Sequence, residues 1–150
     1  MNPGDLVPDF TLSDDEGNQR SLSEFLANGP VVLFFYPAAM TAGCTKESCH
    51  FRDLAKEFAE VGAQRVGISA DTVAKQAEFT AKHSFDFPLL SDPDGVVATQ
   101  FGVRRRLAVL PNRRQTFVID TDRRVLDVIK SEVRMDTHAD QALTALRART

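Results

Sequence analysis

The hydrophobic pattern of the chain alternates between strand-like and helix-like stretches. Residues 30–37, PVVLFFYP, form an unbroken apolar run rich in β-branched and aromatic side chains, which predicts a strand buried on both faces. In residues 45–61 the apolar side chains recur every three or four positions, which predicts an amphipathic helix that ends at Gly62. This alternation continues along most of the chain and indicates an α/β protein.

The same rules predict the remaining elements. They are two short strands within residues 9–22 around a polar turn at Gly17, a strand over 64–70, a helix over 71–84 capped by Asp71, a turn over 91–95, a short helix over 96–103, a hairpin of strands 115–120 and 124–130, and a last helix over 137–147. This order predicts a three-layer sandwich with a mixed central sheet flanked by helices, as in thioredoxin-like folds. In such sheets the active site lies beyond the carboxyl end of a central strand, where the next helix begins.

Composition and charge narrow the classes of function. The chain has 150 residues, 43% of them hydrophobic, and no repeat or linker divides it, so we expect a single domain over residues 1–150. The net charge of −3 provides no basic field for nucleic acid or for an anionic membrane surface. Five arginines lie between residues 104 and 114, and we interpret this stretch as a solvated loop, with docking of an acidic reductant as the alternative.

We expect no targeting or membrane segment in this chain. Its first residues, MNPGDLVPDF, lack a basic region followed by an apolar run, so we expect a cytoplasmic protein without a secretory signal. Residues 25–45 carry no charge, but Gly29, Pro30 and Pro37 interrupt them and leave too short an apolar run to span a bilayer.

The chain has only two cysteines, Cys44 and Cys49. In a reducing compartment a permanent disulfide is disfavoured, which leaves catalysis, redox sensing or metal binding. Metal binding is the weakest of these, because a zinc site needs about four ligands and His50, His83 and His138 are scattered along the chain. We interpret His83 and His138 as structural and expect no metal.

Cys44 lies where the apolar strand gives way to a helix that begins near Cys44 or Thr45. The free backbone N–H groups and the positive end of the helix dipole favour the thiolate over the thiol at such a position. The alternative is an inert, buried thiol that packs like a small apolar side chain. The strand-to-helix junction favours the reactive form.

The spacing of Cys44 and Cys49 indicates a mechanism with two steps. Positions i and i+5 of an intact helix lie roughly 8.7 Å apart at their Cα atoms, whereas a disulfide tolerates at most about 7 Å. The helix must therefore unwind locally before the two sulfurs can bond. This fits a thiolate that a small molecule first oxidises to sulfenic acid and that a second cysteine then joins in an intramolecular disulfide, as in a peroxidase. A Cys-x-x-Cys exchange motif is absent from the sequence.

Several motifs resemble those of one family. Pro37-x-x-x-Thr41-x-x-Cys44 is similar to the peroxiredoxin active-site motif, and GCTKESCHFRDL at 43–54 resembles its PrxQ or bacterioferritin comigratory protein subgroup. GDLVPDFTL, VVLFFYP, GISAD, FPLLSDPDG and RQTFVID follow in the order of that family. The resemblance implies a monomeric thiol peroxidase that needs no cofactor, acts on hydrogen peroxide and organic hydroperoxides, and is recycled by thioredoxin or a similar dithiol protein. Cys44 would be its peroxidatic cysteine and Cys49 its resolving cysteine.

The resemblance also implies roles for four further residues. Pro37 would shield the sulfur from water, Thr41 would hold the sulfur and the peroxide through its hydroxyl, Arg114 would add positive charge, and Glu47 would position that arginine. Fixed donors of this kind suit the negative charge that develops on the leaving oxygen.

Each of these residues has a plainer interpretation. Pro37 would only end a strand, Thr41 would be an ordinary N-cap and Glu47 a solvated charge in the first turn. Arg113 competes with Arg114, and the spacing to the following strand favours Arg114.

Two alternative functions remain open from the sequence. In a redox-sensing interaction protein the same Cys44–Cys49 switch would expose a surface to a partner, and in an oligomeric chaperone it would change the assembly. A complete set of Pro37, Thr41, Cys44 and Arg114 favours the enzyme, because a sensor needs only a reactive thiol. Four residues of the expected pocket rim are apolar where the subgroup commonly has charged residues or proline, which favours organic hydroperoxides; they are Ala38, Ala39, Met40 and Ala42.

Overall fold

The apolar run of the sequence becomes the central strand of the fold, β3 (Val31–Phe35). In a computed structural model that describes residues 1–105 and 111–149, all five residues of this strand are buried. β3 pairs in parallel with β4 (Gln64–Ser69) and antiparallel with β6 (Gln115–Ile119). Alternate side chains of β3 enter two separate cores on the two faces of the sheet, which explains why the run has no polar position.

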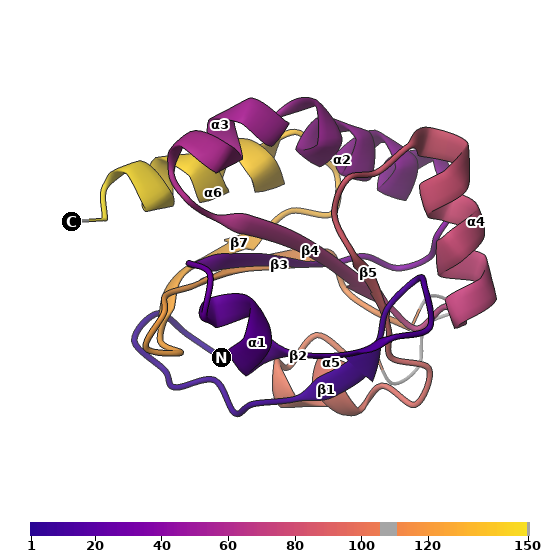
Figure 1. The fold of residues 1–150 in the computed structure, drawn as a ribbon, viewed down its shortest axis with the longest axis horizontal. Helices are drawn as coiled ribbons and strands as arrows, with labels where there is room; N and C mark the ends of the chain where they lie inside the picture. The colour runs from indigo at the N-terminus through magenta and orange to yellow at the C-terminus, as the bar shows by residue number, and fades with distance from the viewer. Residues whose placement is uncertain (106–110, 150) are drawn as a thin grey trace.

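The sheet has seven strands in the order β2-β1-β5-β4-β3-β6-β7 (Figure 1). β3, β4 and β5 run parallel, and the other neighbouring pairs are antiparallel, so the predicted mixed sheet is confirmed. The strands not yet given are β1 (Thr11–Ser13), β2 (Gln19–Ser21), β5 (Leu89–Ser91) and β7 (Val125–Lys130). β5 was not predicted, because three residues are too few to show a period.

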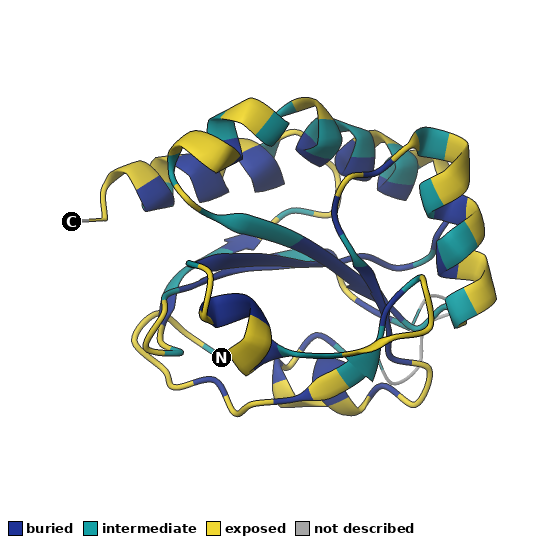
Figure 2. Ribbon diagram, viewed as in Figure 1, coloured by how far each residue is buried: buried dark blue, intermediate teal, exposed yellow. Residues whose placement is uncertain are grey.

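Helices cover both faces of this sheet. α2 (Ala42–Asp53), α3 (Ala55–Glu60), α4 (Val73–His83) and α6 (Thr137–Arg147) lie on one face, and α1 (Leu22–Leu26) and α5 (Val96–Gln100) lie on the other (Figure 1). Their buried residues face the sheet and their exposed residues face outward (Figure 2). The predicted three-layer sandwich is therefore confirmed. No helix within residues 1–105 and 111–149 combines the length and apolar character needed to cross a bilayer.

The single helix predicted over 45–61 is wrong in two respects. The helix begins at Ala42, and it is interrupted at Leu54, whose φ of −96° and ψ of 21° end α2 before α3 begins. The reason is a tertiary contact: the side chain of Arg65 donates a hydrogen bond of 2.8 Å to the Phe51 carbonyl, which an unbroken helix would use for the N–H of Ala55. The resulting pair of helices packs Phe51 and Phe58 side by side in the core, with ring centroids 5.8 Å apart.

The predicted cap of the helix over 71–84 is also wrong by one residue. Thr72 is the N-cap of α4, and its hydroxyl accepts a hydrogen bond of 3.2 Å from the N–H of Lys75. Asp71 instead accepts hydrogen bonds from the Ser69 hydroxyl at 2.6 Å and from the Ala39 N–H at 2.7 Å. Asp71 thereby ties the loop after β3 to the end of β4.

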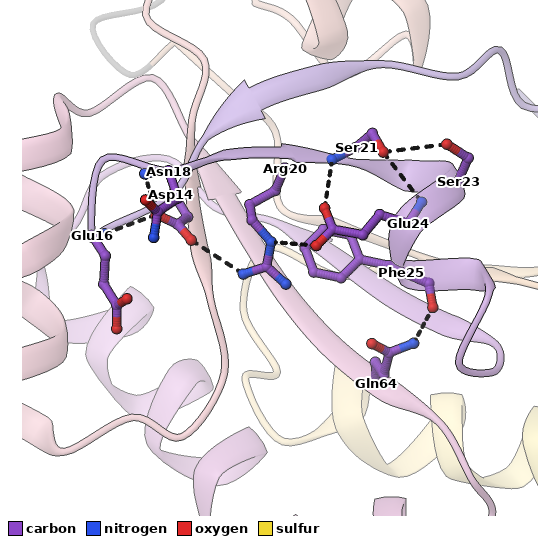
Figure 3. A network of polar contacts seen from close by, with 9 residues as sticks. All are labelled: Asp14, Glu16, Asn18, Arg20, Ser21, Ser23, Glu24, Phe25 and Gln64. Atoms are coloured by element: carbon purple, nitrogen blue, oxygen red, sulfur yellow. Dashed lines mark hydrogen bonds and ion pairs between the residues drawn. The ribbon is translucent and has the colours of Figure 1, made fainter.

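A polar network holds the β1–β2 hairpin to α1 (Figure 3). The guanidinium of Arg20 lies between Asp14, at 3.1 Å, and Glu24, at 3.0 Å. Ser21 and Glu24 form a capping box at the start of α1, and the Gln64 side chain donates a hydrogen bond to a backbone carbonyl of α1. These contacts secure the edge of the sheet that lies away from Cys44.

Candidate active site

Cys44 lies in the first turn of α2, just beyond the carboxyl end of β3. It is the third helical residue, and its side chain is fully buried in the core between the sheet and α2. Backbone N–H groups of this turn have no partner within the helix, and together with the helix dipole they favour a negative charge on the sulfur. The junction predicted from the sequence is therefore present, with the helix starting two residues before Cys44.

Arg114 is in direct contact with this sulfur. Its Nη2 donates a hydrogen bond of 3.3 Å to Cys44 Sγ, and its Nη1 donates one of 2.7 Å to Glu47 Oε1. Only 6% of Arg114 is exposed, and Glu47 is fully buried. Glu47 is thus not a solvated surface charge, and the structure brings Cys44, Glu47 and Arg114 together within one buried cluster.

The register of the sheet explains why Arg114 reaches Cys44. Gln115, the first residue of β6, pairs with Phe35, the last residue of β3, so the preceding Arg114 lies beside the start of α2. The competing Arg113 is exposed. Gly43 leaves room for the guanidinium, because a Cβ at this position would lie 3.2 Å from Arg114 Nη2.

The pKa of Glu47 is far above that of an exposed glutamate. Burial raises its pKa from 4.5 to about 8, and the opposing positive charge of Arg114 compensates only part of that effect. Glu47 therefore retains a proton at pH values at which an exposed glutamate has lost it.

This shift makes the stability of the protein depend on pH. Because the pKa of folded Glu47 lies above its unfolded value, folding takes up a proton, and the resulting stability is present below pH 4.5 and is lost as the pH rises through about 8. We expect Glu47→Gln to remove this part of the slope. Urea unfolding at several pH values between 5 and 8 measures it, with the exposed Glu60→Gln as the matched control. Equal slopes in wild type and Glu47→Gln would contradict the shift.

His138 belongs to the same buried cluster, although the sequence analysis interpreted it as structural. It is fully buried on α6, where its Nε2 lies 2.8 Å from the Ser131 carbonyl oxygen and its Nδ1 lies 2.7 Å from Thr116 Oγ1. The same Nδ1 lies 3.6 Å from Glu47 Oε2. No local motif signals this contact, because it depends on how α6 packs against α2.

Pro37 and Thr41 lie on the loop between β3 and α2. Pro37 is buried. Thr41 is exposed and occupies the N-cap position of α2, and its hydroxyl donates a hydrogen bond of 2.7 Å to the Ala38 carbonyl. The structure shows no hydrogen bond between Thr41 and Cys44, so contact of its hydroxyl with the sulfur or with peroxide stays a prediction.

Cys49 lies on the same continuous helix as Cys44, and both are free thiols. It is half-buried, and burial raises its pKa. Cys49 lines an open cavity of about 270 Å³ together with Lys46, His50, Asp53 and Asp136. Since α2 is intact between the two cysteines, the predicted separation applies, and a disulfide requires part of the helix to unwind.

The basic stretch at 104–114 lies partly outside the described residues, because positions 106–110 are not among them. Arg105 forms an ion pair of 2.8 Å with Glu132, and Arg114 is part of the buried cluster. Among the described residues, no group of three or more His, Cys, Asp or Glu side chains is arranged to hold a metal ion.

Comparison with known proteins identifies the family. Residues 3–128 match the sequence model of the AhpC/TSA family. The chain is 39% identical over 149 residues to the chloroplastic peroxiredoxin Q of Oryza sativa subsp. japonica, covering 99% of this chain and 68% of the relative. The crystal structure of peroxidoxin BcpB from Mycobacterium tuberculosis has 65% identity and a TM-score of 0.96, covering 100% of this chain and 99% of that one. The bacterioferritin comigratory protein of Xanthomonas campestris, from a study of its alkyl peroxide reduction activity, has 35% identity and a TM-score of 0.84, covering 93% and 90%. The chain, with Cys44 at the start of α2, belongs to the AhpC/TSA family of peroxiredoxins, which are thiol peroxidases.

Proposed function

We propose that this peroxiredoxin reduces hydrogen peroxide and organic hydroperoxides through a Cys44 sulfenic acid and a Cys44–Cys49 disulfide. The observation that carries the proposal is the position of Cys44 Sγ, which lies in the first turn of α2 and 3.3 Å from Arg114 Nη2. Both features favour a thiolate, which is the nucleophilic form of cysteine.

In the first step the Cys44 thiolate attacks one oxygen of the peroxide, and the O–O bond breaks. The sulfur is oxidised by two electrons to sulfenic acid, and the second oxygen leaves as water or an alcohol after it takes up a proton. Arg114 and the first-turn N–H groups are the donors that stabilise charge on the leaving oxygen, and the Thr41 hydroxyl joins them when it releases the Ala38 carbonyl. Buried Pro37 shields the sulfur from water. The apolar Ala38, Ala39, Met40 and Ala42, which follow it in the chain, favour organic hydroperoxides.

In the second step the first turns of α2 unwind, and the Cys49 sulfur attacks the Cys44 sulfenic acid. A disulfide forms and water leaves. Burial holds Cys49 as a thiol in the intact helix, and unwinding exposes the sulfur to water, where it ionises more readily. Thioredoxin or a similar dithiol protein then reduces the disulfide. The protein acts as a monomer in the cytoplasm, a reducing compartment that supplies such a reductant.

We expect Cys49→Ser to separate the two steps. The variant forms the Cys44 sulfenic acid with the first equivalent of peroxide at the wild-type rate, because Cys49 takes no part in that attack, but its steady turnover with thioredoxin is lost. A sulfenic acid-specific label measures the first step, and NADPH consumption through thioredoxin reductase measures the second. His50→Gln, in the same cavity as Cys49, is the matched control and retains turnover. Wild-type turnover of Cys49→Ser would overturn the resolving role.

A redox-sensing interaction protein is the alternative. It requires the Cys44–Cys49 switch but not a guanidinium fixed at hydrogen-bond distance from the sulfur. The contact between Arg114 and Cys44 therefore favours the enzyme.

A further inference from the structure

The buried cluster contains a polar atom that lacks a partner. Glu47 Oε1 accepts a hydrogen bond from Arg114, whereas Glu47 Oε2 is buried without a hydrogen-bond partner among the described residues. The atom that faces it is Nδ1 of His138, 3.6 Å away. Both side chains are fully buried, so bulk solvent does not reach either atom.

The tautomer of His138 follows from its other nitrogen. The Ser131 carbonyl oxygen can only accept a hydrogen bond, so the Nε2 that lies 2.8 Å from it carries a hydrogen. In the neutral imidazole Nδ1 is then an acceptor. This Nδ1 already accepts the hydrogen bond of the Thr116 hydroxyl at 2.7 Å and offers no donor to Glu47, so an ionised carboxylate would leave Oε2 charged and unpartnered in the core unless the pair carries one further proton.

We propose that Glu47 and His138 hold one proton between them, so that this pair is neutral and the positive charge of Arg114 remains available to the sulfur of Cys44. His138 is then a positioning residue that acts through Glu47. Either the carboxyl group carries the proton and faces Nδ1, or the imidazolium Nδ1–H contacts Thr116 and faces the carboxylate. The net charge of the pair is the same in both forms. The inference rests on the proposed role of Cys44 as the reactive thiolate.

The charges around the pair support this assignment. The charged groups near it are Arg114 before β6 and Glu132 between β7 and α6, and Arg114 in turn contacts Cys44 on α2. Glu132 is balanced elsewhere, because it pairs with Arg105 at 2.8 Å and accepts the backbone N–H of Arg114 at 3.1 Å. If Glu47 lost the shared proton, Arg114 would face two buried anions, and the cluster would carry an uncompensated charge.

Burial shifts both members of the pair toward their neutral forms. It raises the pKa of Glu47 and lowers the pKa of His138. These directions place the proton of the pair mainly on the carboxyl group.

Two substitutions of His138 separate its two nitrogens. In Gln the amide nitrogen lies as far along the side chain as Nε2, so His138→Gln retains the donor for Ser131 and loses the atom that faces Glu47. In Asn the amide lies at the position of Nδ1, so His138→Asn has the opposite effect. If His138 acted only through its hydrogen bond to Ser131, His138→Gln would behave more like the parent than His138→Asn.

The readout is the fraction of Cys44 present as thiolate, measured by ultraviolet absorbance against pH in a Cys49→Ser background that leaves one thiol. We expect His138→Gln to move the midpoint of this titration to higher pH by about one unit, which is about tenfold less thiolate at a pH below the midpoint. We expect His138→Asn to leave the midpoint near that of the parent. The half-buried His83→Leu, on α4, is the control and should also leave it unchanged.

Repeating the His138→Gln substitution in a Glu47→Gln variant tests whether His138 acts through Glu47. The side-chain oxygen of Glu47→Gln can accept from Arg114 and its NH₂ carries no ionisable proton, so no proton remains to be lost there. We expect His138→Gln to shift the midpoint in the parent but not in this background. A shift of equal size in both backgrounds, an unchanged midpoint in His138→Gln, or a larger shift in His138→Asn would each overturn the proposal.

A measurement on the unsubstituted protein does not depend on how the variants fold. At pH 7 either the infrared spectrum contains a protonated carboxyl band that Glu47→Gln lacks, or the ¹⁵N spectrum shows Nδ1 of His138 protonated. Absence of both would overturn the shared proton. A failed peroxide assay alongside these signals would count against the proposed function and not against the pair, because neither readout involves peroxide.

Discussion

Replacement of Cys44 by serine is expected to abolish peroxide reduction, with a loss in kcat/KM on the order of 10³-fold or more. A serine hydroxyl is similar in size and can still accept a hydrogen bond from Arg114, but it does not ionise near neutral pH and forms no analogue of sulfenic acid or of a disulfide. The fold should therefore persist while the chemistry is lost. Peroxide consumption in the presence of thioredoxin and its reductase measures the loss.

Intact mass and a thiol count after one equivalent of peroxide extend this test. Wild type should lose both thiols and about 2 Da at constant chain number, which corresponds to an internal disulfide. Cys44→Ser should keep its single thiol, Cys49, under the same conditions. Slow oxidation that is equal in the two proteins would mean that Cys44 is an inert core thiol, and the family relationship would then describe the fold without the activity.

The parts of the fold that were predictable are those in which local pattern and burial agree. β3 is buried on both faces, so its apolar run could be identified directly. The position of Cys44 at a strand-to-helix junction was also predictable, because the sequence indicates both the end of this strand and the start of the next helix. The contact of Arg114 with Cys44 was reached through the resemblance to peroxiredoxins, and the register of Gln115 against Phe35 now gives it a physical cause.

The parts that were not predictable depend on contacts between distant residues. The break at Leu54 arises because the side chain of Arg65, on β4, donates a hydrogen bond to the Phe51 carbonyl. The sequence of residues 45–61 contains nothing that predicts this contact. His138 was interpreted as structural for the same reason. The sequence around a histidine on an amphipathic helix does not show whether the side chain is functional. Only the packing of α6 on α2 places Nδ1 of His138 beside Glu47.

Removal of the Arg114 charge is expected to reduce both stability and activity. Arg114→Leu leaves the buried Glu47 carboxyl group without its donor at 2.7 Å, and an unsatisfied buried polar group of this kind costs about 1–3 kcal/mol in the free energy of unfolding. The carboxyl group can escape part of this cost by retaining its proton. The destabilisation should therefore be larger at pH 8 than at pH 5, because loss of Arg114 raises the already high pKa of Glu47 further.

The double variant Arg114→Leu/Glu47→Leu separates stability from catalysis. Replacing both members of a buried pair by apolar residues is often neutral for stability, so urea unfolding should show recovery of most of the loss. Peroxidase activity should remain on the order of 10²- to 10³-fold below wild type, because the donor to the sulfur and to the leaving oxygen is still missing. Arg113→Leu, at the exposed neighbouring position, is the control and should change stability by no more than about 0.5 kcal/mol. If the double variant regained activity together with stability, Arg114 would serve only to neutralise Glu47, and the thiolate would depend on the first turn of α2 alone.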